Sequence, residues 1–209
     1  MTEKEKVFNK IATEEAQRQG DNIGNFEYYS YYLCPDQYVG IIKNVTKKKR
    51  FWRKKLDEFD CREKTIFILL QESPHQDEYE YAEDVSERIS IGPSNGETGI
   101  KIWKYLKKKL GKDYEQYKDF YLILMNPVQH QCSLGRETKY CRTRIFNKVF
   151  DKNDLINRIK NICKVAKTVV ILPAPTSVVK KKIEKCLNEL KIENLEKILP
   201  TVSHPSAWK

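Results

Sequence analysis

The chain has 209 residues, of which 40% are hydrophobic and 33% are charged. This is enough for one domain with a buried core, and the chain is too apolar for a disordered tail. No apolar run reaches the roughly 18 residues that a membrane-spanning helix needs, and the first ten residues lack the apolar centre of a signal peptide. We therefore expect a cytoplasmic, globular monomer.

Charge and cysteine content narrow the possible partners. Thirty-nine Lys and Arg against 29 Asp and Glu leave a net charge of +10, which favours a polyanion such as nucleic acid. The six cysteines include no CxxC pair, so neither a zinc ribbon nor a disulfide framework is indicated, and free thiols are expected.

The first 60 residues predict an N-terminal extension packed on a core formed by residues 61–209. Residues 4–19 have the pattern of a charged helix, which the glycines of the GDNIG turn at 20–24 end. The aromatic segment 26–42 supplies either packing or base stacking. The basic run 47–55 is either a solvated face or a phosphate contact.

From residue 65 onward, short apolar runs alternate with amphipathic segments, which is typical of βα units. The expected strands are 65–70, 120–126, 168–173 and 196–202, and the expected helices between them are 100–110, 155–167 and 177–190. Unbroken apolar strands are buried on both faces. The sequence therefore predicts an α/β fold with a small parallel four-stranded sheet and helices on both faces.

Ligands of open α/β sheets bind beyond the carboxyl ends of the strands. The three histidines of the chain, His75, His130 and His204, all follow predicted strands, which marks these exits as the candidate site. Together with Glu72 or Asp77 they could alternatively bind a metal. The acidic stretch 77–87 favours a solvated face instead, and the absence of a GxSxG elbow disfavours a serine hydrolase.

Four motifs at these exits, in this order, resemble those of the uracil-DNA glycosylase superfamily. They are FILLQESPH, LILMNPVQHQ, VVILPAPTSVVKKK and HPSAW. The intervening ISIGPSNGETGIKIWKYL is similar to a further family stretch, and the likeness covers about residues 65–209. It implies a glycosylase that flips a uracil or another damaged base out of DNA and hydrolyses its N-glycosidic bond, as in DNA repair, without metal or other cofactor.

The resemblance implies roles for particular residues. Glu72 would stabilise positive charge on the sugar or orient water, His204 would donate to the departing base, and Asn126 would bind the edge of a pyrimidine. Gln71, Ser73, His75 and Ser206 would line the substrate site. Phosphate and nucleic-acid contacts would come from Ser94, Ser177, Lys180, Lys181 and again Ser206.

Departures from the family pattern leave alternatives open. Ser73 takes the place of the aspartate of the commonest branch, unless the motif slides by one residue and Glu72 takes it, and His75 takes the place of the tyrosine that excludes thymine. Ile89 replaces the phenylalanine that stacks on uracil, and Trp208 occupies the position of a leucine wedge. The cysteine spacing of an iron-sulfur cluster is absent. The alternatives are a non-catalytic relative that binds DNA, RNA or a nucleotide, and a metal-dependent nuclease or phosphoesterase.

Overall fold

The computed structural model of the chain describes residues 3–19, 33–46, 54–75, 78–81, 88–90, 92, 94, 96–132 and 138–209. Its centre is a sheet with the strand order β2-β1-β6-β3-β7-β8. The strands are β1 (Gln37–Ile41), β2 (Lys54–Lys55), β3 (Thr65–Leu70), β6 (Tyr121–Met125), β7 (Thr168–Pro173) and β8 (Leu195–Ile198). A separate antiparallel hairpin pairs β4 (Tyr79–Tyr81) with β5 (Arg88–Ser90).

The four predicted strands all form, and β6, β3, β7 and β8 run parallel. The two central strands, β3 and β7, coincide with the predicted ranges 65–70 and 168–173, and every residue after their first threonine is buried. Both strands were predictable because their apolar runs are unbroken. Each side chain of such a strand packs against a helix layer on one face of the sheet or the other.

The sheet is mixed rather than purely parallel, which corrects the expectation of four parallel strands. β1 lies beside β6 and is antiparallel to it, and the short β2 pairs antiparallel with β1 at the edge. β1 comes from the aromatic segment that the sequence analysis placed in the N-terminal extension. Its residues alternate in burial at Gln37, Tyr38 and Val39, and such a short alternation was hidden among neighbouring tyrosines.

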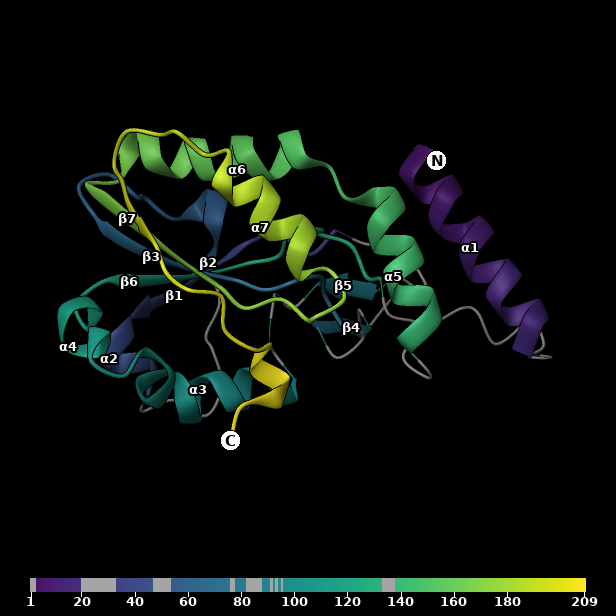
Figure 1. Ribbon diagram of the computed structural model, residues 1–209, viewed down its shortest axis with the longest axis horizontal. Helices are drawn as coiled ribbons and strands as arrows, with labels where there is room; N and C mark the ends of the chain where they lie inside the picture. The colour runs from purple at the N-terminus through teal and green to yellow at the C-terminus, as the bar shows by residue number, and fades with distance from the viewer. Residues whose placement is uncertain are drawn as a thin grey trace.

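Helices cover both faces of the sheet (Figure 1). One face packs against α6 (Lys152–Val165) and α7 (Lys180–Asn188), with α5 (Thr138–Val149) beside them. The N-terminal helix α1 (Glu3–Gln19) packs on the outer side of α5. The other face packs against α2 (Ile42–Val45), α3 (Glu97–Leu110) and α4 (Asp113–Tyr117). Two 3-10 turns, η2 (Leu56–Glu58) and η4 (Pro205–Ala207), complete the described elements.

The side chains of β3 alternate between these two layers. Ile66, Ile68 and Leu70 belong to the core under α5–α7, whereas Phe67 and Leu69 belong to the core over α3. Because a strand has a period of two residues, the alternation continues past the strand end. The side chain of residue 71 is thereby directed toward the α3 face and that of residue 72 toward the α5–α7 face.

The strand order creates a crevice between the ends of β3 and β7. From β3 the chain crosses by α3 to β6 on one side, and from β6 it returns over the opposite face to β7 on the other side of β3. The loops that leave β3 and β7 therefore diverge, which is the topological switch point where open α/β sheets bind ligands.

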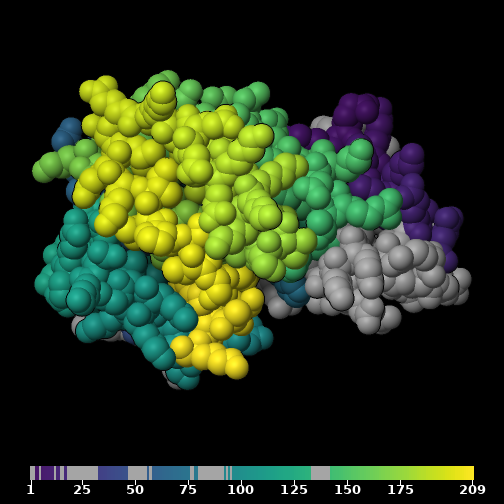
Figure 2. Space-filling view, in the orientation of Figure 1, coloured from purple at the N-terminus to yellow at the C-terminus, as the bar shows by residue number. Residues whose placement is uncertain are grey.

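The C-terminal segment is drawn into the same region. Leu199 N donates to Ile171 O at 2.8 Å and Val202 N to Pro173 O at 3.0 Å, so the chain after β8 follows the end of β7. In Figure 2 these residues, in yellow, lie against the teal region that contains α3. Across the described parts of the chain, no helix combines the length and apolarity that crossing a membrane requires.

Candidate functional site

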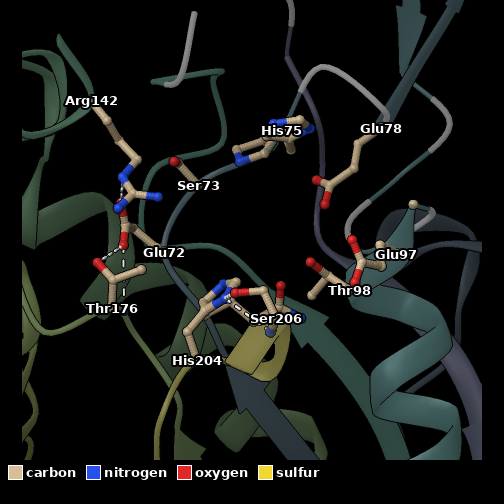
Figure 3. Close-up of a pocket in the computed structure, with 13 residues that line it drawn as sticks. Glu72, Ser73, His75, Glu78, Glu97, Thr98, Arg142, Thr176, His204 and Ser206 are labelled. Atoms are coloured by element: carbon tan, nitrogen blue, oxygen red, sulfur yellow. Dashed lines mark hydrogen bonds and ion pairs between the residues drawn. The ribbon is translucent and has the colours of Figure 1, made fainter. Parts of the chain in front are cut away.

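A cavity of about 270 Å³, lined mainly by polar residues, opens at the switch point. Its walls come from the β3 exit at 71–75, from Glu78, from the start of α3 at 96–98, from Arg142 and Thr176, and from His204 and Ser206. Figure 3 shows Glu72 with Arg142 and Thr176 on one side, Glu78 and Glu97 on the other, and His204 below. The volume lies near the lower limit of about 300 Å³ for small-ligand pockets, so a ring of nucleobase size is a suitable occupant.

Glu72 is the buried carboxylate of this cavity, with a side chain only 3% exposed. Arg142 Nε of α5 lies 3.2 Å from Glu72 Oε1. On the other oxygen, Oε2, the hydroxyl of Thr176 donates a hydrogen bond and the amide of Thr176 donates a second at 3.4 Å. The ion pair offsets the cost of burying the charge and fixes the orientation of the carboxylate.

His204 forms the floor of the cavity, and its ring orientation is fixed by Ser206. Nδ1 accepts the backbone N–H of Ser206 at 3.3 Å and lies 2.8 Å from its hydroxyl. Burial, together with the positive charge of Arg142, lowers the pKa of His204 to about 4. The imidazole is therefore neutral near pH 7, and because Nδ1 is an acceptor, the proton is on Nε2.

The opposite wall is organised by Ser94. Its hydroxyl donates to Gln71 Oε1 and its backbone N–H donates to Glu78 Oε1, each at 2.7 Å. Gln71 and Glu78 are 2% and 4% exposed and both line the cavity. Ser94 itself is fully buried, so the predicted phosphate contact by Ser94 is wrong: its polar groups face the protein interior.

The structure brings together most of the predicted substrate residues, since Gln71, Ser73, His75 and Ser206 line the cavity with Glu72 and His204. Asn126 is not among the residues that line it. Its side chain is fully buried, and neither amide atom has a hydrogen-bond partner among the described residues. His130 does not line the cavity either, so the three strand exits that carry histidine do not converge on one point.

Of the residues predicted to contact nucleic acid outside the cavity, some are exposed and others are buried. Ser177 is exposed, Lys180 Nζ lies 3.7 Å from Glu184 at the start of α7, and Lys181 is exposed. Trp208 is 1% exposed within the α3 core, and its Nε1 donates to Ser203 O at 2.8 Å. The prediction of Trp208 as a wedge is corrected by this burial, because a ring held in the core is not presented to DNA.

Some of the predicted residues cannot be placed because they lie wholly or partly outside the described residues. Ile89 pairs with Glu80 in the β4–β5 hairpin, but its side chain lies outside the described residues, so the stacking position is untested. The same holds for residues 47–53 of the basic run and for most of the acidic stretch 77–87.

Several residues of the site escaped the sequence analysis. Arg142 lies within a helix that the sequence did not predict, and nothing in its local pattern marks it. Thr176 follows a predicted strand, so its position alone was a usable signal. Glu78 was assigned to a solvated acidic face, yet the loop after β3 turns it into the interior.

The described residues contain no group of three or more His, Cys, Asp or Glu side chains placed to hold a metal ion. His75, His204 and three glutamates line the cavity, but no three of these side chains lie close enough together to share an ion. Asp77, which the sequence offered as a further ligand, lies outside the described residues.

Comparison with known proteins gives no further constraint. No family model, no curated protein and no solved structure matches the chain.

Proposed function

We propose that the protein is a uracil-DNA glycosylase-like hydrolase that cleaves the N-glycosidic bond of a uracil or another damaged base in DNA. One observation carries the proposal: the carboxylate of Glu72 and the neutral imidazole of His204 line the same cavity of nucleobase size. Cleavage of this bond needs a group that stabilises positive charge on the sugar and a donor for the departing base.

In the proposed reaction the base enters the cavity from the DNA and the bond between its nitrogen and C1′ breaks. The bonding electrons leave with the base, and negative charge builds on its carbonyl oxygen. His204 Nε2–H donates to that oxygen. Because this imidazole is neutral, it stabilises the charge by a hydrogen bond and keeps its proton.

Glu72 acts at the sugar. Arg142 and Thr176 each occupy one of its oxygens, but an ionised carboxylate has about four lone-pair sites, so positions for a water molecule remain. Glu72 orients this water toward C1′ and its charge opposes the positive charge of the sugar. The water oxygen bonds to C1′, and its released proton neutralises the base anion.

The proposal excludes Trp208 and Asn126 from direct contacts in the conformation described. The DNA is held instead by exposed cations, of which the +10 charge provides an excess. This attraction would be independent of DNA sequence and would weaken with rising salt.

A second candidate is binding of a nucleotide or nucleic acid without cleavage. The observation that favours it is that both oxygens of Glu72 are already engaged by protein groups. Such engagement leaves fewer positions on the carboxylate for the water molecule that cleavage needs. Cleavage and binding must therefore be measured separately.

The decisive experiment incubates the protein with oligonucleotides that each carry one uracil or one damaged base, in EDTA, and then treats them with alkali. Strand breaks at the modified position are expected from wild type, and Glu72→Gln should lower their rate about 10²-fold or more while leaving DNA affinity within a few fold. Glu193→Gln, at an exposed site, is the matched control. Salt-dependent binding without breaks in any substrate would favour the second candidate.

A further inference from the structure

Ser94 forms hydrogen bonds to two side chains that line the cavity. Neither Glu72 nor His204 takes part in these bonds. Its φ of 59° lies in the left-handed region, which is uncommon for a residue other than glycine. In this conformation its N–H and its hydroxyl bond to two different side chains, Glu78 and Gln71. A serine is suited to this position because it supplies both donors and stays small enough to be fully buried.

The bond from Ser94 determines what Gln71 presents to the cavity. Its Oε1 is engaged by the Ser94 hydroxyl, whereas its Nε2 has no hydrogen-bond partner among the described residues. A buried amide donor left without a hydrogen-bond partner is unfavourable. Because Gln71 lines the cavity, this donor is available to an acceptor atom on an occupant.

Glu78 presents hydrogen-bond acceptors to the cavity, in contrast to the donor of Gln71. Its Oε1 accepts the Ser94 N–H, and Figure 3 shows its carboxyl group directed into the cavity, across from Glu72. A carboxylate accepts hydrogen bonds and does not donate them. Since Glu78 and Gln71 bond to the same residue, they form one short stretch of wall with an acceptor beside a donor.

The charges around the cavity exclude a phosphate as its deep occupant. Two buried carboxyl groups, Glu72 and Glu78, face it, and the Arg142 charge is paired with the first. A third carboxylate, Glu97, lies at the rim within 3.1 Å of Lys101. A neutral ring with a polar edge suits these surroundings better than an anion.

We infer that Ser94, Gln71 and Glu78 form a specificity wall that selects a base carrying an acceptor and an N–H donor at adjacent ring positions. The inference rests on the proposed function and names its substrate class. A lactam edge, C=O beside N–H, has this pattern, and so does a ring nitrogen beside an amino group. A ring whose N–H is methylated is excluded, because the methyl group removes the donor and meets the Glu78 carboxyl.

The test measures the binding of free nucleosides by calorimetry, so that it does not depend on cleavage of DNA. The sugar blocks the ring nitrogen that would otherwise be a further N–H donor. The probes are deoxyuridine and deoxyinosine for the lactam edge, deoxycytidine and deoxyadenosine for the amino edge, and 3-methyldeoxyuridine and 1-methyldeoxyinosine as blocked counterparts. At least one lactam or amino nucleoside should bind. In the lactam series, each methylated counterpart should bind at least 10-fold more weakly, because the methyl group removes the N–H that the Glu78 carboxyl would accept.

Two variants test the residues. Glu78→Gln replaces one acceptor oxygen by a donor amide and should reduce the preference for the unmethylated base about 10-fold, while Glu193→Gln leaves it unchanged. Ser94→Ala removes the hydroxyl that orients Gln71 and should weaken binding of the preferred base. Thermal unfolding of each variant shows whether it folds. If a variant does not fold, the comparison of methylated with unmethylated bases on the wild-type protein still tests the inference.

The inference fails if wild type binds no nucleoside of either series, if it binds methylated and unmethylated nucleosides equally, or if folded Glu78→Gln keeps the full preference. The outcomes for the proposed function are separate. Cleavage in DNA without discrimination by the methyl group would retain the glycosylase and overturn the specificity wall. Discrimination without cleavage would retain the wall and overturn the glycosylase.

Discussion

Arg142 Nε lies 3.2 Å from Glu72 Oε1, although 70 residues of chain separate the two side chains. Glu72 follows β3 and Arg142 belongs to α5, so the pair joins the end of the sheet to the helix layer in the wall of the cavity. The positive charge of Arg142 balances the negative charge of the Glu72 carboxylate, which is almost fully buried.

Removing the charge of Arg142 should destabilise the fold and disorder Glu72. Loss of one partner of a fully buried ion pair costs about 3–5 kcal/mol, and because the Arg142 side chain is 26% exposed, we expect Arg142→Gln to cost less than this. Urea unfolding measures the effect. The double variant Glu72→Gln/Arg142→Gln should recover part of the loss, and strict additivity of the two single variants would contradict the coupling.

The pH dependence of His204 follows from its low pKa. Because the pKa is about 4, the imidazole should remain neutral from pH 8 down to about 5, and cleavage should be independent of His204 protonation over that range. Below this range Nδ1 is protonated and no longer accepts the N–H of Ser206, so the hydrogen bond that fixes the orientation of the ring is lost. NMR titration of the histidine ring protons, assigned with His204→Asn, measures the pKa directly.

Arg142 contributes to this low pKa after burial, which is the larger cause. Arg142→Gln should therefore raise the pKa of His204 and move the acidic limb of the activity profile to higher pH. The folded pKa lies below the unfolded value of about 6.5. The stability contributed by neutral His204 is thus fully present above about pH 6.5 and is lost as the pH falls toward 4. An unchanged His204 titration in folded Arg142→Gln would contradict the electrostatic contact.

Trp208 should matter for stability rather than for DNA contact. Trp208→Ala removes a ring from the α3 core and is expected to cost about 3–5 kcal/mol. Trp208→Phe keeps most of the packing and loses the bond from Nε1 to Ser203 O, for about 1 kcal/mol. Chemical denaturation gives both values. A folded Trp208→Phe protein should bind DNA as wild type does, and a large loss of affinity would restore the wedge hypothesis.

A second buried ion pair fixes the end of β6. Arg158 Nη1 donates to both oxygens of Asp36 at 2.8 and 2.6 Å, and its Nη2 donates to the carbonyl oxygens of Asn126 and Pro127 at 3.0 and 3.1 Å. Asp36→Asn leaves the Arg158 charge without its main partner and should cost about 3–5 kcal/mol. Hydrogen exchange should show faster opening of the segment 126–128.

The control for this pair is Asp154→Asn, because Asp154 is half exposed and contacts only the Nε of the same arginine. Exposed ion pairs contribute about 0–1 kcal/mol. Equal losses of stability in Asp36→Asn and Asp154→Asn would show that burial does not govern the strength of this cluster.

The sequence by itself determined the parallel core of the protein. The apolar runs of β3 and β7 predicted strands that the structure reproduces to the residue, because a strand covered on both faces has an unbroken apolar pattern that few other elements share. It also determined that polar residues such as Glu72 and His204 lie at strand exits. This follows from local order along the chain and needs no knowledge of packing.

The tertiary structure decided which of those residues meet. The crossing of the chain on opposite sides of β3 brings the exits of β3 and β7 and the C-terminal segment together and leaves Asn126 outside the cavity. It also buries Glu78 and Trp208, which the sequence placed on the surface. These placements depend on contacts between residues distant in the chain, such as Glu72 with Arg142, and local periodicity carries no information about such partners.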